Sequence, residues 1–78
     1  MPTIYREGEY RFFFNSREET RMHVHVESPR GNAKFWLEPI VALELAYNLN
    51  VKELTRIEQI VRQHQDEFIA AWRRHFAQ

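Results

Sequence analysis

The sequence contains no cysteine, which excludes disulfide bonds and thiolate metal sites and is typical of a protein in a reducing cytoplasm. It also lacks any apolar run of the roughly 20 residues that a membrane-spanning helix needs, and its start lacks the pattern of a signal peptide. An excess of charge is absent too, because 11 basic side chains balance 11 acidic ones. We therefore expect a soluble cytoplasmic protein without membrane association and without a general attraction to nucleic acid.

What the chain does have is apolar and aromatic bulk. Hydrophobic residues make up 44% and aromatic residues 14% of its 78 residues, which is enough for folding. No repeat, low-complexity tract or linker interrupts the sequence, so we expect one domain over residues 1–78. The core of so short a chain is marginal, and without disulfides the remaining means of support is a partner.

Alternation of apolar and polar residues predicts an antiparallel meander. Three strands are expected, at about 10–14, 21–27 and 33–38. A fourth strand at about 40–46 stays open, because its residues alternate as in a strand although Ala, Leu and Glu favour helix. Residues 1–9 form an entry segment or an edge strand, and a polar connection at 15–20 joins the first two strands.

One long helix is expected at about 51–76. Asn50 can cap its first turn, and Glu53 three residues later can complete a capping box. Apolar residues then recur at steps of three and four without Gly or Pro. The predicted fold is α+β: a three- or four-stranded antiparallel meander with one long C-terminal helix packed on one face.

Such a helix would be longer than its sheet. At ~1.5 Å per residue it spans about 39 Å, whereas four strands span about 15–20 Å. Unless the helix bends near 63–65, its second half has nothing in its own chain to cover it, and this predicts a homodimer or a dedicated protein partner. The expected interface residues are His64, Phe68, Ile69, Trp72 and Phe76.

Two histidines carry the most specific chemistry. His23 and His25 lie on the same side of one predicted strand, about 6.5–7 Å apart. Further side chains expected on this face, or at its border, form a basic and aromatic surface for a ligand or partner. They are Arg11, Phe13, Arg21, Glu27, Lys34 and Trp36.

Three interpretations of this surface stay open. The imidazoles could bind a metal, which would need a third or fourth ligand for which only Glu27 and Glu38 are candidates, and we predict no metal and no cofactor. They could act as acid and base in metal-free RNA cleavage, with Arg11, Arg21 or Lys34 stabilising the phosphorane. They could instead belong to a protein interface, where aromatic residues and arginine are enriched, and this interpretation is favoured.

The chain resembles a small bacterial family of unknown function, the domain of unknown function forty-one sixty. The resemblance rests on M-P-T-I at 1–4, an aromatic strand and acidic turn at 11–19, H-V-H-V at 23–26, A-K-F-W-L-E-P at 33–39, and Trp72. It implies no established activity. It does imply a tight protein partner, because members of such families are often encoded beside a second small protein, as in toxin–antitoxin modules.

The preferred function is therefore a small interaction protein, one component of a toxin–antitoxin-like two-protein module that pairs with itself, with a small cognate protein, or with both. The alternatives are a metal-independent ribonuclease-like toxin with His23 and His25 as acid and base, or a histidine-based metal-binding protein. The sequence leaves open whether the protein is an enzyme and whether it meets RNA.

Overall fold

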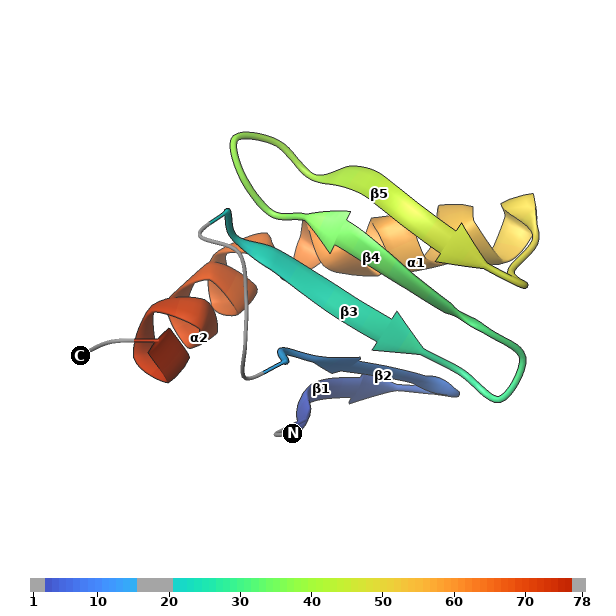
Figure 1. Cartoon of the computed structure of the whole chain (residues 1–78), viewed down its shortest axis with the longest axis horizontal. Coiled ribbons are helices and arrows are strands. Elements are labelled where there is room, and N and C mark those ends of the chain that lie inside the picture. Colours follow the sequence, from blue (N-terminus) through green and yellow to red (C-terminus); the bar gives the residue numbers. More distant parts are fainter. Residues whose placement is uncertain (1–2, 16–20, 77–78) are drawn as a thin grey trace.

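A computed structural model describes residues 3–15 and 21–76, and it places both helices on one face of an antiparallel sheet (Figure 1). The strands are β1 (Thr3–Glu7), β2 (Tyr10–Phe13), β3 (His23–Glu27), β4 (Asn32–Trp36) and β5 (Ala42–Tyr47), and they follow one another across the sheet in chain order. The helices are α1 (Val51–Gln63) and α2 (Gln65–Phe76). The α+β class and the meander are thus confirmed.

The sheet has five strands, so the prediction of three or four was wrong. The open segment at 40–46 forms β5, and the entry segment forms β1, which pairs with β2. Gly8 in the connecting turn has φ 59°, which glycine adopts without steric cost. The predicted connection at 15–20 lies, beyond Asn15, outside the described residues.

Both edge strands are irregular. The register between β1 and β2 shifts between Thr3 and Tyr5. The register between β4 and β5 shifts beside Lys34 and Phe35, where Lys34 pairs with Leu45 but Phe35 pairs with Leu43. An extra residue in one strand of a pair changes which face the next side chain points to.

The apolar face of the sheet and the helices form one core. Alternate residues of the central strands point into it, as the sequence pattern predicted. Its members are Phe12, Phe14, Val24, Val26, Ala33, Phe35, Leu37, Val41, Ile57, Ile60, Val61, Phe68 and Trp72.

The single long helix predicted over 51–76 is wrong, because the helix breaks at His64. The His64 N–H donates to Ile60 O at 3.0 Å and ends α1, while His64 O accepts from Phe68 N at 2.8 Å and begins the bonding of α2. The break turns α2 toward the sheet, so that Phe68 and Trp72 are only 2% and 7% exposed. Burial of these two aromatic side chains contributes to the stability of this arrangement.

The start of α1 is as predicted. Asn50 Oδ1 accepts from Glu53 N at 2.8 Å, and the Glu53 carboxylate accepts from Asn50 N at 3.4 Å, which completes the capping box. Neither described helix combines the length and apolar character that crossing a bilayer demands.

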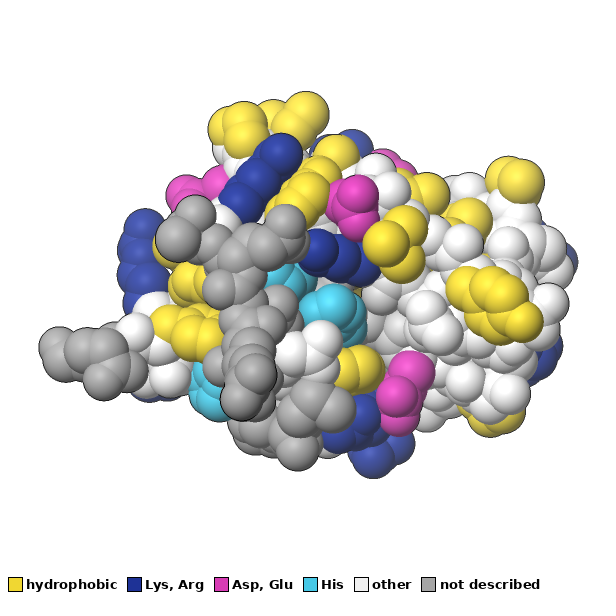
Figure 2. Space-filling model, in the orientation of Figure 1, with side chains coloured by type: hydrophobic (Ala, Val, Ile, Leu, Met, Phe, Trp, Pro, Cys, Tyr) yellow, Lys and Arg dark blue, Asp and Glu magenta, His cyan; other side chains and the backbone are white. Residues whose placement is uncertain are grey.

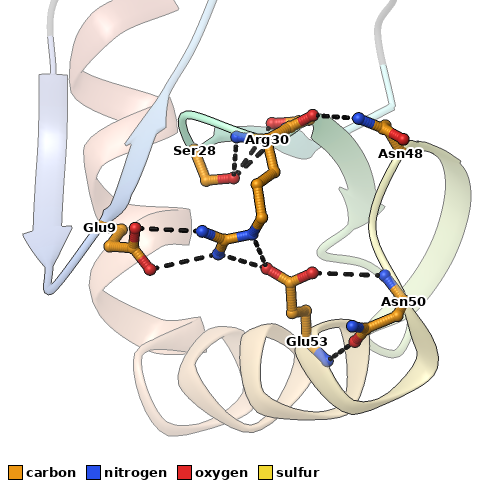
Figure 3. A network of polar contacts seen from close by, with 7 residues as sticks. Glu9, Ser28, Arg30, Asn48, Asn50 and Glu53 are labelled. Carbon is orange, nitrogen blue, oxygen red and sulfur yellow. Dashed lines mark hydrogen bonds and ion pairs between the residues drawn. The ribbon is translucent and has the colours of Figure 1, made fainter.

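Arg30 joins this capping box to two turns of the sheet (Figure 3). Its guanidinium donates to both carboxylate oxygens of Glu9 at 3.1 and 3.2 Å, and its Nε donates to Glu53 at 2.7 Å. Asn48 Nδ2 donates to Arg30 O at 2.6 Å. The β1–β2 turn, the β3–β4 turn and the link from β5 to α1 are therefore held by one side chain.

This arrangement favours the charged form of Glu53. The hydrogen bond from Arg30 lowers the pKa of the Glu53 carboxyl below its ordinary value, with a smaller contribution from the backbone of Asn50, against the opposing effect of burial. The hydrogen bonds from Arg30 to Glu9 and then to Glu53 raise the pKa of the Arg30 guanidinium.

A carboxyl whose pKa is lower in the folded state stabilises the fold above its unfolded pKa, and that contribution is lost as pH falls through the folded pKa. We expect Glu53→Gln to reduce the free energy of unfolding at neutral pH. The difference from wild type should shrink as the pH falls below the ordinary value of 4.5. Urea denaturation over a pH series measures this.

Glu58→Gln is the matched control, because Glu58 pairs with Arg62 at 2.9 Å on the surface of α1. Such exposed pairs contribute little to stability. If the difference in free energy of unfolding between Glu53→Gln and wild type stays constant down to acid pH, the charged Glu53 carboxylate is not what stabilises the fold.

Candidate functional site

The face of the sheet turned away from the helices brings the predicted site residues together. We call it the histidine face and define it by the side chains that β2, β3 and β4 present there: Arg11, Phe13, His23, His25, Glu27, Lys34 and Trp36. Strand register pairs Phe13 with His25, His25 with Lys34, and His23 with Trp36. Figure 2 views this face, with histidine side chains near its middle and basic side chains beside them.

His23 is part of the packed interior. It is 0% exposed, and its Nδ1 lies 2.8 Å from Arg21 O, so Nδ1 donates to this carbonyl. Its ring makes edge-to-face contacts with two tryptophans. The centroid distance is 5.1 Å to Trp72 from α2 and 5.8 Å to Trp36. The sequence placed His23 on a surface, whereas the break between the helices brings Trp72 against it.

His25 is the more exposed member of the pair. Its half-buried ring stacks on Phe13 with centroids 5.4 Å apart and planes 21° apart. Asn15 Nδ2 lies 3.0 Å from His25 Nε2, so the amide donates to this nitrogen when it is unprotonated. A hollow of about 390 Å³ opens beside the ring. Its lining includes Phe13, Asn15, His25, Glu27, Asn32, Lys34 and Leu45.

Three of the residues named here were not predicted as site residues. Asn15 lies two positions after Phe13, so strand alternation could have placed it on the same face. Asn32 lies on this face because the β3–β4 register pairs it with Glu27, a pairing that the sequence alone did not give. Leu45 lines the hollow because β5 pairs it with Lys34 of β4. This pairing depends on β5 lying beside β4 and on the irregular register between the two strands.

Cations lie over the aromatic rings at both sides of the histidines. Arg11 Cζ lies 4.6 Å from the centre of the Phe13 ring. Arg21 Cζ and Lys34 Nζ lie 4.1 and 4.8 Å from the Trp36 ring. Such contacts are favourable by ~0.5–2 kcal/mol and hold flat side chains in fixed positions.

Glu27, which the sequence offered as a metal ligand, is paired with Arg11 at 3.0 Å. Within residues 3–15 and 21–76, no group of three or more His, Asp or Glu side chains converges as a metal site requires.

The predicted oligomer interface lies mostly inside the chain. Phe68 and Trp72 belong to the core, and Ile69 and Phe76 pack against it. The ring of His64 contacts that of Tyr5 in a tilted arrangement, with centroids 4.2 Å apart. The overhang from which a dimer was predicted is therefore absent, although the dimer itself stays a prediction.

Exposed apolar side chains gather elsewhere, on β5 and its flanks. They are Ile40, Leu43, Leu45, Tyr47 and Val51, with exposed fractions of 66%, 43%, 50%, 69% and 79%. Alternation at 41–47 was visible in the sequence, but its position at an edge of the sheet was not.

Comparison with known proteins finds one family. A family model described as "Domain of unknown function (DUF4160)" matches residues 9–73, which span the sheet from β2 onward and most of both helices. No curated protein and no solved structure matches the chain.

The two histidines should differ in their effect on stability. His23→Ala removes a fully buried ring and should lower the free energy of unfolding by about 2–4 kcal/mol. His25→Ala removes a half-buried ring and should cost about 1 kcal/mol or less. Urea denaturation followed by circular dichroism measures both variants, and equal losses would contradict the assigned roles.

Proposed function

This chain belongs to the family described as a domain of unknown function (DUF4160), and from that premise we propose that it is a small protein-binding protein. It uses the histidine face to bind the second component of a two-protein, toxin–antitoxin-like module. The observation that supports this proposal most is the layer of cations over Phe13 and Trp36.

Aromatic rings and arginine dominate the energetics of protein interfaces, because they bury a large area with few rotatable bonds. Trp36 is half-buried, and Arg21 is fixed both over its ring and by a 3.0 Å hydrogen bond from Nε to Glu38 O. A partner therefore meets side chains that are already ordered, which reduces the entropy lost on binding.

The charges of the face fit a protein better than a nucleic acid. Arg11 is balanced by Glu27 at 3.0 Å, and the whole chain has a net charge of zero. Phosphate binding depends on an excess of positive charge, and its strength falls steeply with salt. Burial of His23 also leaves only one imidazole of the pair beside the hollow.

We expect Trp36→Ala to weaken binding to the protein encoded beside this chain by about 30-fold or more, which corresponds to ~2 kcal/mol. Isothermal titration calorimetry with the purified pair measures the change. Val51→Ala, which removes apolar surface on α1 far from the histidine face in sequence, should leave affinity unchanged. No complex with wild type, or equal affinity for both variants, would overturn the proposal.

One observation favours a second candidate, a metal-independent ribonuclease-like activity. His25 lies beside the hollow, is oriented by Asn15 and is paired in register with Lys34. An imidazole near a cation can take a 2′-hydroxyl proton while the cation stabilises the phosphorane. In this candidate His25 carries the proton transfer and His23 supports the fold.

The ribonuclease candidate predicts that purified wild type degrades RNA and that His25→Ala abolishes the activity while the fold is retained. Cleavage of a fluorescent RNA by freshly purified protein measures it, with Val51→Ala as a control that keeps activity. Intact RNA after incubation with wild type would remove this candidate and leave the binding function untouched.

A further inference from the structure

β5 is an edge strand with an unusually apolar surface. It pairs with β4 on one side, and no other described strand pairs with its outer side (Figure 1). Leu43, Leu45 and Tyr47 are all exposed, and Glu44 is its single charged residue. Edge strands that stay unpaired usually carry several charges or proline, and β5 carries neither.

We propose that β5 pairs antiparallel with β5 of a second copy of this chain, with Ala46 on the two-fold axis. The two five-stranded sheets then form one continuous sheet. This inference is independent of the partner-binding function proposed above, because it concerns an edge of the sheet rather than the histidine face.

The direction of the backbone groups selects Ala46. A Cβ placed on Gly31 would lie 2.1 Å from Tyr47 O, so the Tyr47 carbonyl points toward the β4 side. Backbone groups of successive residues in a strand point to alternate sides, which turns the N–H and C=O of Ala46 outward. Two copies of Ala46 can then exchange both hydrogen bonds as an antiparallel pair.

The side chains are complementary in this register. Leu45 comes opposite Tyr47 of the second copy, and Tyr47 comes opposite Leu45, so two Leu–Tyr pairs form on the side of the sheet that carries the histidine face. Ala46 meets itself, and its small side chain allows close approach. Glu44 comes opposite Asn48, so no two like charges are brought together.

Other registers are poorer. An axis at Glu44 would place two carboxylates directly opposite each other, which is destabilising. An axis at Leu45 would oppose Leu43 to Tyr47, yet the register shift places Leu43 with the buried Phe35 and Tyr47 with Asn32, on opposite faces. In the Ala46 register, the pairs formed by Leu45, Ala46 and Tyr47 lie in the regular part of β5 beyond the irregularity.

The other edge fits a second copy less well. Two of the five residues of β1, Arg6 and Glu7, are charged, and Glu7 is already engaged by Tyr5 and Arg56. Charged side chains on an edge strand oppose pairing with another chain.

Light scattering after size exclusion tests the interface. Wild type should have twice the 9.5 kDa chain mass. Ala46→Pro should be a monomer with an unchanged circular dichroism spectrum, since proline removes only an outward N–H and is tolerated at a strand edge. Val51→Lys, at an equally apolar exposed position outside β5, should remain a dimer, as should Trp36→Ala.

A cross-link tests the register even if Ala46→Pro fails to fold. The chain has no cysteine, so Ala46→Cys carries a single thiol. Paired residues in the proposed register have Cα atoms about 5.5 Å apart, within the range of a disulfide. Mild oxidation should give a covalent dimer, whereas Leu43→Cys, whose two copies lie roughly 20 Å apart at ~3.4 Å per residue, should not.

A wild type that stays monomeric across a dilution series would overturn the proposal. So would a dimer that forms no cross-link in Ala46→Cys. Because Trp36→Ala acts on partner binding and Ala46→Cys on self-association, failure of one proposal is distinguishable from failure of the other.

Discussion

The break at His64 is the constraint on which the rest of the structure depends. A short sheet can bury only a short helix, and the chain satisfies this limit by ending α1 at Gln63 and turning α2 across the remaining apolar surface. The turn is stabilised by the contact of the His64 ring with Tyr5 and by burial of Phe68 and Trp72. It also brings Trp72 into contact with the fully buried ring of His23, whereas His25 lies beside the hollow.

A second set of contacts fixes the opposite end of the sheet. The Arg30 guanidinium donates to Glu9 and Glu53, and the Arg30 carbonyl accepts from the Asn48 side chain, so three connections that are distant in sequence are held at one point (Figure 3). The close approach of Gly31 to Tyr47 O belongs to the same region. The C-terminal end of β5 is therefore fixed by contacts with the β3–β4 turn, and the strand presents a defined edge.

Local sequence rules predicted the parts of the fold that local physics determines. The capping box of Asn50 and Glu53 needs only residues three apart, and alternation needs only neighbours, so the helix start, the central strands and the grouping of His25, Lys34 and Trp36 were all predictable. β1 was left undecided because an edge strand is only half covered and its sequence is mixed.

The remaining features arise from contacts between distant segments. No Gly or Pro marks the break at His64, because the gain comes from burying Phe68 and Trp72 against the sheet. The burial of His23 follows from that break and could not be derived from H-V-H-V alone. Likewise, the placement of Leu43 and Leu45 on different faces follows from a register shift that no local pattern reveals.

Both edge strands have an irregular register, but the two edges of the sheet differ in the residues that they present. At β1 the regular segment beyond the shift carries the charged residues Arg6 and Glu7, whereas at β5 the regular segment beyond the shift is apolar. The dimer proposed above uses only the β5 edge of each copy and leaves the charged β1 edge unpaired. In that dimer, growth by addition of strands would end at two copies, so the exposed leucines that promote pairing would not propagate into a fibre.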